Sequence, residues 1–373
     1  MTIAYNHLET IVYPERIAEN WRRLEAIGGH ACAVIKADAY GHGLLETARA
    51  LDRAGAHTLG AGTVEEAARI RADGYSGRVM SLLGAQLDTD FELAARERIV
   101  PFTGRMEQLR RMDETGRRLG MRVPIALKLD TGMGRLGFVP EDAPALAEAL
   151  ADMSGVEVSM VCSHLATADM PEERDYVLEQ GRRFANAVDV LRRAGYAFEA
   201  NLANSAALLA YPELRHDAQR PGISLYGCNV FWGTDMAELG ADFAPAMEVR
   251  SRVYQVHELK TGQSVNYGRT FVAPCDMRVA IIAAGYSDNF PRALSNRGFA
   301  NIGGTRVPLV GRVCMQMSAL DVTELPGVKP GDDVWLLGGP GAGAIRAEEV
   351  ADWCGTISYE VLCLLGQNPR RFA

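Results

Sequence analysis

The chain has 373 residues, of which 48% are hydrophobic and 23% are charged. This balance is typical of a folded globular protein and excludes a mainly disordered one. The formal net charge of −8 argues against a protein that binds nucleic acid or an anionic membrane surface, since either needs a basic face. Apolar runs such as 279–284 are far shorter than the ~20 residues that cross a bilayer. The length predicts two domains, or one large barrel with an appendage.

The cysteines and the first residues of the chain bear on its cellular compartment. Seven cysteines are scattered singly with no CxxC pair, which predicts free thiols in a reducing environment. No basic segment leads into an apolar one near Met1, so no signal peptide is expected. No group of His and Cys has the spacing of a zinc site, and we expect no metal. A cytoplasmic protein is therefore predicted.

Short apolar runs alternate with amphipathic stretches from about residue 31 to residue 227. The predicted strands are 31–36, 58–61, 78–83, 99–102, 123–129, 156–164, 198–203 and 222–226. Between them, Thr63 and Glu66 form an S/T-x-x-E capping box that opens a helix, and 143–151 and 172–193 have a helical period. Alternation repeated about eight times favours an α/β fold with a TIM-like (β/α)8 barrel, although a doubly wound sheet alternates in the same way.

The pattern changes after about residue 233. Short apolar runs at 247–256, 277–283, 305–310 and 334–337 recur between Gly, Pro, Asp and Asn, which predicts a mainly-β domain. We therefore expect a barrel domain over residues 9–233 and a β-strand C-terminal domain over residues 234–373. The sequence of residues 1–8 leaves open whether they add a strand to that second domain.

Polar residues stand where the predicted barrel strands end, which is where barrel enzymes place their active sites. Lys36 ends the first strand, where lost hydration would free its amine for imine or base chemistry, unless it simply leaves the sheet for solvent. Lys128 lies inside an apolar strand and must be paired, with Asp130 as a candidate, or else be neutral or modified. The other strand-end residues are Arg135, His164, Asn204, Ser205, Arg220 and Gly222.

The predicted second domain has three segments that combine aromatic and turn residues, at 265–271, 285–296 and 311–317. For Tyr267 and Tyr286, residue type alone favours aromatic packing beside turn glycines. In the barrel, Ser205 follows the seventh predicted strand and Gly222 opens the eighth, and the loops after strands seven and eight are the recurrent phosphate site of that fold.

Taken in chain order, these segments closely resemble bacterial alanine racemases, which are fold-type III pyridoxal-phosphate enzymes. The matching positions are 34–43, 128–137, 164, 204–205, 220–223, 225–227, 266–270, 285–286, 291–296, 311–315 and 357–361. The resemblance implies interconversion of L- and D-alanine, either for peptidoglycan or for alanine catabolism. It also implies a homodimer in which each active site borrows residues from the partner's β domain.

The resemblance also implies a role for each matching residue. Lys36 holds pyridoxal 5′-phosphate and is one base of a two-base mechanism, and Tyr267 of the partner subunit is the other. Lys128 matches a lysine often found carbamylated, which would orient Arg135. The implied cofactor contacts are Lys36, Tyr40, Arg135, His164, Asn204, Ser205, Arg220, Gly222, Ile223 and Tyr359, and the implied substrate contacts are Arg135, Met315 and Tyr286.

Two positions depart from the family pattern. Gln316 stands where an Asp usually follows the methionine, and 287–290 differs from the commoner Ala-Asp-Gly pattern. A neutral amide in place of a carboxylate favours, as an alternative, a racemase of serine or of several amino acids. A barrel-type decarboxylase of basic amino acids and a non-catalytic pyridoxal-phosphate carrier are disfavoured, because the β domain carries Tyr267.

Overall fold

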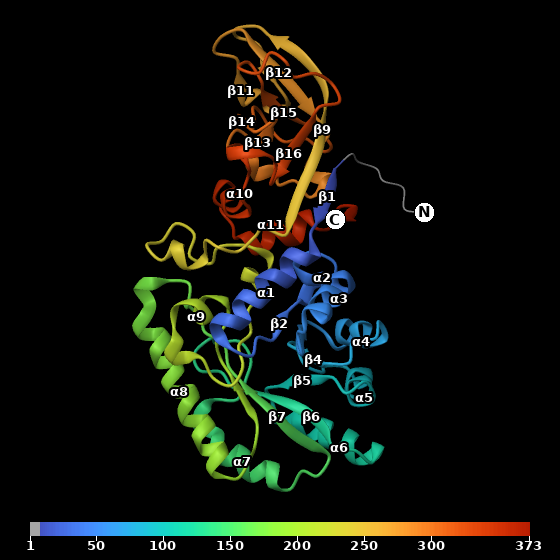
Figure 1. The fold of residues 1–373 in the computed structure, drawn as a ribbon, viewed down its shortest axis with the longest axis vertical. Coiled ribbons are helices and arrows are strands. Elements are labelled where there is room, and N and C mark those ends of the chain that lie inside the picture. The colour runs from blue at the N-terminus through green and yellow to red at the C-terminus, as the bar shows by residue number, and fades with distance from the viewer. Residues whose placement is uncertain (1–7) are drawn as a thin grey trace. The chain divides into compact units, whose positions relative to one another are not determined.

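The computed structural model describes residues 8–373, which form two compact units that we treat separately (Figure 1). The barrel unit comprises Ile17–Ala39 and Gly43–Ala244, and the β unit comprises residues 8–16, Tyr40–His42 and Pro245–Ala373. The strand considered for residues 1–8 lies, except for Leu8, outside the described residues. Within residues 8–373, no helix is long and apolar enough to cross a membrane.

A parallel sheet of seven strands, in the order β2 to β8, forms the centre of the barrel unit. Its interior is filled by buried side chains such as Met80, Phe102 and Met160. The strands are β2 (Ala33–Val34), β3 (Thr58–Ala61), β4 (Arg78–Ser81), β5 (Val100–Thr103), β6 (Val123–Lys128), β7 (Val156–Cys162) and β8 (Glu199–Asn201). The TIM-like barrel predicted from the alternation is thus confirmed.

The barrel closes where the sequence did not predict a strand. Parallel bridges join Gln219 to Ala31 and Ala218 to Asn201, so this extended segment connects both edges of the sheet. The strand predicted at 222–226 is wrong, because Ile223–Tyr226 is a 3-10 helix, η4, that follows Pro221 and Gly222. Its apolar side chains are buried, which is why they look like a strand in the sequence.

Helices follow the strands along the chain and lie outside the sheet (Figure 1). The capping box at the start of α4 is confirmed, since the Thr63 hydroxyl accepts the Glu66 N–H at 3.0 Å. Helix α7 has the predicted bounds, whereas α8 starts two residues later than predicted because a 3-10 turn, η2 (Pro171–Glu173), precedes it. The helices are α1 (Pro14–Gly28), α3 (Leu44–Ala54), α4 (Val64–Ala72), α5 (Asp88–Arg96), α6 (Met106–Leu119), α7 (Ala143–Ala151), α8 (Arg174–Arg193) and α9 (Ser205–Ala210).

The β unit is organised around the long strand β9 (Met247–Leu259), which pairs with β1 (Glu9–Val12), β12 (Met277–Ile282) and β16 (Asp333–Leu337). The eight-stranded sheet confirms the predicted mainly-β domain. Two short helices, α10 (Ala347–Cys354) and α11 (Ser358–Leu365), were not predicted. The remaining strands are β10 (Ser264–Val265), β11 (Phe271–Val272), β13 (Phe299–Ile302), β14 (Thr305–Pro308), β15 (Ser318–Asp321) and β17 (Arg370–Phe372).

Candidate active site

Lys36 follows β2 and begins an unusual turn, α2 (Lys36–Tyr40). Ala37 to Tyr40 all have φ between 53° and 54°, which is left-handed backbone without a glycine. Each such residue costs about 1–2 kcal/mol, so neighbouring groups must hold the turn in place. The Lys36 side chain is exposed, as expected of an amine at the carboxyl end of a barrel strand.

Two carboxylates hold this left-handed turn. The carboxylate of Glu66 accepts the N–H of Asp38 at 3.1 Å and the N–H of Gly62 at 2.7 Å. The carboxylate of Asp38 in turn accepts the N–H of Leu44 at 2.8 Å, at the start of α3. Glu66 therefore ties the residues after Lys36 to the end of β3, a role that the capping-box pattern alone did not reveal.

Ser205 and Gly222 lie together, as the barrel topology predicts. The Ser205 hydroxyl accepts the N–H of Gly222 at 2.9 Å and that of Ser224 at 3.4 Å. The hydroxyl of Ser224 is buried and has no hydrogen-bond partner among the described residues. This concentration of N–H and O–H donors suits a phosphate. Asn204, by contrast, caps α9 by accepting the N–H of Ala207 at 3.0 Å.

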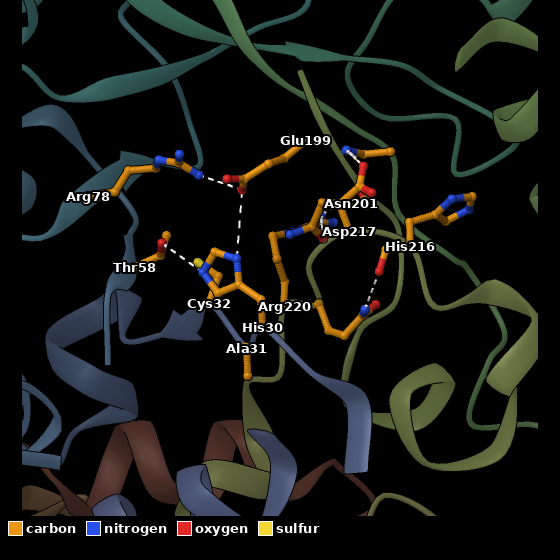
Figure 2. A network of polar contacts seen from close by, with 12 residues as sticks. His30, Ala31, Cys32, Thr58, Arg78, Glu199, Asn201, His216, Asp217 and Arg220 are labelled. Carbon is orange, nitrogen blue, oxygen red and sulfur yellow. Dashed lines mark hydrogen bonds and ion pairs between the residues drawn. The ribbon is translucent and has the colours of Figure 1, made fainter. Parts of the chain in front are cut away.

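Arg220 is only 5% exposed and is held by neutral oxygens. It donates to the backbone carbonyl of Asn201 at 2.9 Å and also to the side-chain Oδ1 of that residue (Figure 2). Its second terminal nitrogen donates to the backbone carbonyl of Ser163. Within residues 8–373, Arg220 forms no ion pair with a carboxylate. A buried positive charge therefore stands uncompensated at this end of the barrel.

Lys128 is 6% exposed, and its amine donates to the Leu129 carbonyl at 2.8 Å. Burial, together with the charge of Arg220, lowers the pKa of Lys128 to about 7. Asp130, the partner considered from the sequence, is engaged elsewhere, because it accepts the N–H of Gly134 at 3.0 Å and that of Arg135 at 2.8 Å. Although burial opposes them, these and neighbouring N–H donors keep the pKa of Asp130 below its usual value.

The same cations act on His164. Burial is the main cause that lowers the pKa of His164 well below its usual value. The positive charges of Arg220, Lys128, Arg135 and Lys36 lower it further, so these side chains lie within electrostatic reach of the imidazole. His164 is therefore neutral at physiological pH.

Arg135 is exposed in the loop after β6, where Asp130 fixes its backbone. A cavity of about 160 Å³ is lined in part by Lys128 and by the loop residues Leu136 and Gly137. The other lining residues are Leu83, Gln86, Phe102, Gly104, Arg105 and Gln108.

In the β unit, hydrogen bonds join the three segments that combine aromatic and turn residues. Asn266, with φ of 61°, donates to the Arg312 carbonyl at 2.8 Å. Asn296 accepts the N–H of Gly311 at 2.6 Å and donates to the Thr270 hydroxyl at 3.2 Å. Tyr267, next to Asn266, is 73% exposed, so the packing that residue type favours for it is wrong.

The segments of Tyr286 and Met315 are also joined. The N–H of Tyr286 donates to the Cys314 carbonyl at 3.0 Å, and the Ser287 hydroxyl donates to the Met315 carbonyl at 2.7 Å. Tyr286 is 45% and Met315 58% exposed, so Tyr286 is only partly packed. A Cβ at Gly285 would lie 2.2 Å from the Met315 oxygen, so only glycine allows this approach. Gln316 is exposed beside them.

Tyr40 and Tyr359, both of the β unit, lie close together with ring centroids 5.8 Å apart. Tyr40 is 6% exposed, and burial raises the pKa of its phenol, so it remains a hydrogen-bond donor at neutral pH. Tyr359 is 39% exposed. The sequence predicts Glu66 only as part of a helix cap and does not single out Asn201, because each acts on the site through a contact that only the fold creates.

Comparison with known proteins places this arrangement in a family. Residues 12–230 match the model of the alanine racemase N-terminal domain, and residues 246–373 match that of the alanine racemase C-terminal domain. The chain belongs to the alanine racemase family. It is therefore an amino-acid isomerase, and its family reaction is the racemisation of alanine.

Individual relatives match this chain over nearly its whole length. The alanine racemase of Nitratidesulfovibrio vulgaris (strain Miyazaki F) is 49% identical over 371 residues, which are 99% of each chain. The biosynthetic alanine racemase of Pseudomonas aeruginosa has a TM-score of 0.88 at 34% identity, with 99% of each chain covered. The alanine racemase of Bartonella henselae, solved with covalently bound pyridoxal phosphate, has a TM-score of 0.88 at 26% identity and covers 98% and 99% of the two chains.

Proposed function

We propose that this chain interconverts L- and D-alanine with pyridoxal 5′-phosphate bound at Lys36, and that it does so in a cytoplasmic homodimer. The observation that carries the proposal is the convergence, at the carboxyl end of the barrel strands, of an exposed lysine, an uncompensated arginine and a cluster of phosphate-type donors. The covalent cofactor of the Bartonella henselae relative supports the same assignment.

The residues present fit this cofactor. The hydroxyl of Ser205, the buried hydroxyl of Ser224 and the backbone of Gly222 and Ile223 suit its phosphate. Among residues 8–373, Arg220 meets neutral oxygens and the ring of Phe102 but no carboxylate, and it is available to the pyridine nitrogen. The exposed amine of Lys36 suits the aldehyde. His164, Asn204, Arg135, Tyr40 and Tyr359 complete the proposed cofactor contacts. When bound, the cofactor supplies an electron sink that makes the α-hydrogen of alanine acidic.

The chain then has to move a proton on each face of the substrate. The Lys36 amine takes or returns the proton on the D-alanine face, and the phenol oxygen of Tyr267 of the partner subunit does so on the L-alanine face. A phenol acts as a base only where nearby cations stabilise its anion. Arg135 and Arg220 are the proposed source, whereas His164, being neutral, adds no charge.

Lys128 takes part in the proposal through its amine. With a pKa of about 7, part of the Lys128 population is neutral at physiological pH and can attack CO2. A bond then forms from Nζ to carbon, one proton leaves, and the product is an anionic carbamate. The cavity that Lys128 lines has room for this group. The carbamate would pair with Arg135 and fix its direction.

A second candidate function rests on Gln316. This exposed amide stands beside Met315 and Tyr286, the proposed substrate contacts, where the family pattern has a carboxylate. A broader-specificity or serine racemase would use the same bases. Comparing turnover of L-alanine, L-serine and L-lysine by the purified holoenzyme separates the two, since equal rates on all three would favour the broad enzyme.

The two-base assignment is tested by hydrogen exchange in D2O. The holoenzyme is expected to incorporate α-deuterium into both alanine enantiomers. Lys36→Ala should lose both the cofactor that borohydride traps and all exchange. Tyr267→Phe should keep trapped cofactor but lose exchange from L-alanine.

Two exposed residues that are not among the proposed site residues serve as matched controls, Lys329→Ala for the lysine and Tyr254→Phe for the tyrosine. Unchanged exchange from L-alanine in Tyr267→Phe would refute the second base. Cofactor trapped equally well in Lys36→Ala would refute the first.

A further inference from the structure

The side chain that holds Arg220 is not explained by the proposed function. Asn201 is fully buried at the end of β8 and offers Arg220 two oxygens, its backbone carbonyl and its Oδ1 (Figure 2). Ser163, just after β7, offers a third oxygen from its backbone. The guanidinium is thus fixed from two neighbouring strands, and every acceptor is neutral.

A carboxylate at position 201 would be the more usual partner of a buried arginine, because arginine–carboxylate pairs form the stronger hydrogen bonds. Strand β8 does place a carboxylate two residues earlier, where Glu199 pairs with Arg78 at 2.5 Å (Figure 2). Position 201 carries an amide instead, and the Nδ2 of that amide is buried without a hydrogen-bond partner among the described residues. Only the oxygen of the Asn201 amide is used, so the property that distinguishes it from aspartate is its lack of charge.

We propose that Asn201 is a positioning residue whose neutral amide fixes the direction of the Arg220 guanidinium while leaving its positive charge uncompensated. The charge then acts on its neighbours, His164 and Lys128, which both experience it. Lys128, Arg135 and Lys36 also influence His164, and all three are cations. Asp130, which acts on Lys128, is occupied by backbone N–H groups. That a bound pyridine nitrogen would meet this positive charge is the only part of the proposal that rests on the proposed function.

The test uses the cofactor-free protein, so it does not depend on turnover. Asn201→Asp is expected to shift the pKa of His164 upward, because the new carboxylate compensates Arg220. Titration of labelled histidines by NMR measures this shift. Asn201→Ala is expected to leave the pKa of His164 low but to loosen the guanidinium, which relaxation of the Arg220 Nε resonance detects. Arg220→Gln is the positive control and should shift the pKa of His164 upward.

Three outcomes would overturn the proposal. The first is an unchanged pKa of His164 in Asn201→Asp. The second is an upward shift of that pKa in Asn201→Ala as large as in Asn201→Asp. The third is an Arg220 Nε in Asn201→Ala that relaxes as in the unmodified chain. If Asn201→Asp does not fold, the relaxation of the Arg220 Nε resonance in Asn201→Ala decides alone whether the proposal stands. Asn201→Ala should also bind pyridoxal 5′-phosphate about tenfold more weakly, the effect of losing one hydrogen bond to a charged group. Failure of the unmodified chain to bind pyridoxal 5′-phosphate would contradict the proposed function but not the anchoring of Arg220.

Discussion

At the scale of single residues, the burial of Lys128 makes the free energy of unfolding depend on pH. The pKa of its amine is 10.5 in an exposed chain and about 7 in the folded protein. Folding therefore disfavours the charged form of the Lys128 amine. Below pH 7 the free energy of unfolding is lowered by the full cost of burying that charge. Between these two values the unfolded chain binds more protons than the folded one, so the free energy of unfolding rises with pH.

This sign leads to a prediction about stability. Relative to Lys128→Met, the wild-type chain should gain stability as pH rises from about 7 to about 10, and Lys128→Met should be the more stable protein below pH 7. Urea unfolding in CO2-free buffer measures the difference. Lys329→Met, an exposed lysine, is the control and should show no such slope. Added bicarbonate at pH 8 should stabilise the wild-type chain but not Lys128→Met. Parallel pH profiles for the wild-type chain and Lys128→Met would contradict the shifted pKa.

Some single residues were predictable from the sequence and others were not. Lys128 was recognised as anomalous because a charged residue interrupts an apolar strand, a local signal. Asn201 carried no such signal, since its partner Arg220 lies 19 positions away and meets it only when the barrel closes. The exposure of Tyr267 was not predictable from residue type either, because an aromatic side chain favours packing.

At the scale of elements, the left-handed turn after Lys36 depends on Glu66. The strain of its non-glycine residues must be offset by the N–H groups that this carboxylate accepts. Glu66→Gln should therefore reduce kcat more than it changes KM, and it should slow the borohydride-trappable attachment of pyridoxal 5′-phosphate to Lys36.

The helix that carries Glu66 provides a matched control. Thr63→Ala removes the other half of the same capping box without touching the turn. It should lower the free energy of unfolding by about 1 kcal/mol while leaving kcat intact. If Thr63→Ala and Glu66→Gln lower stability and kcat alike, Glu66 is only a helix cap, and its proposed positioning of Lys36 is wrong.

Elements with strong local periodicity were predicted well. Helix α7 and strand β3 have the predicted bounds because small apolar residues repeat at a helical period in one and run together in the other. The segment at 218–221, which closes the barrel, was not predicted because Gln219, Arg220 and Pro221 do not form the apolar run that indicates a strand. The left-handed turn was missed because Ala-Asp-Ala-Tyr contains none of the glycines that usually mark positive φ.

At the scale of the whole molecule, the proposed site residues divide between the two units. Lys36, Ser205 and Arg220 belong to the barrel unit, whereas Tyr267, Tyr286 and Met315 belong to the β unit. The β unit exposes large apolar side chains, among them Met315 (58%), Met317 (49%) and Ile357 (61%). A subunit interface, as in the proposed homodimer, would cover such side chains.

A dimer that shares its active sites makes a prediction about mixtures of inactive chains. Lys36→Ala and Tyr267→Ala, each inactive alone, should recover activity when they are unfolded together and refolded as hybrids. In a hybrid, one site receives both damaged residues and the other receives neither, so random pairing should restore roughly a quarter of the wild-type activity. The matched control mixes Lys36→Ala with Ser205→Ala. Both of these residues belong to the barrel unit, so every site of such a hybrid keeps one defect and no activity should return. If hybrids form, as shown by mass spectrometry of the intact dimers, and yet Lys36→Ala with Tyr267→Ala stays inactive, then Tyr267 acts within its own chain and the shared site is wrong.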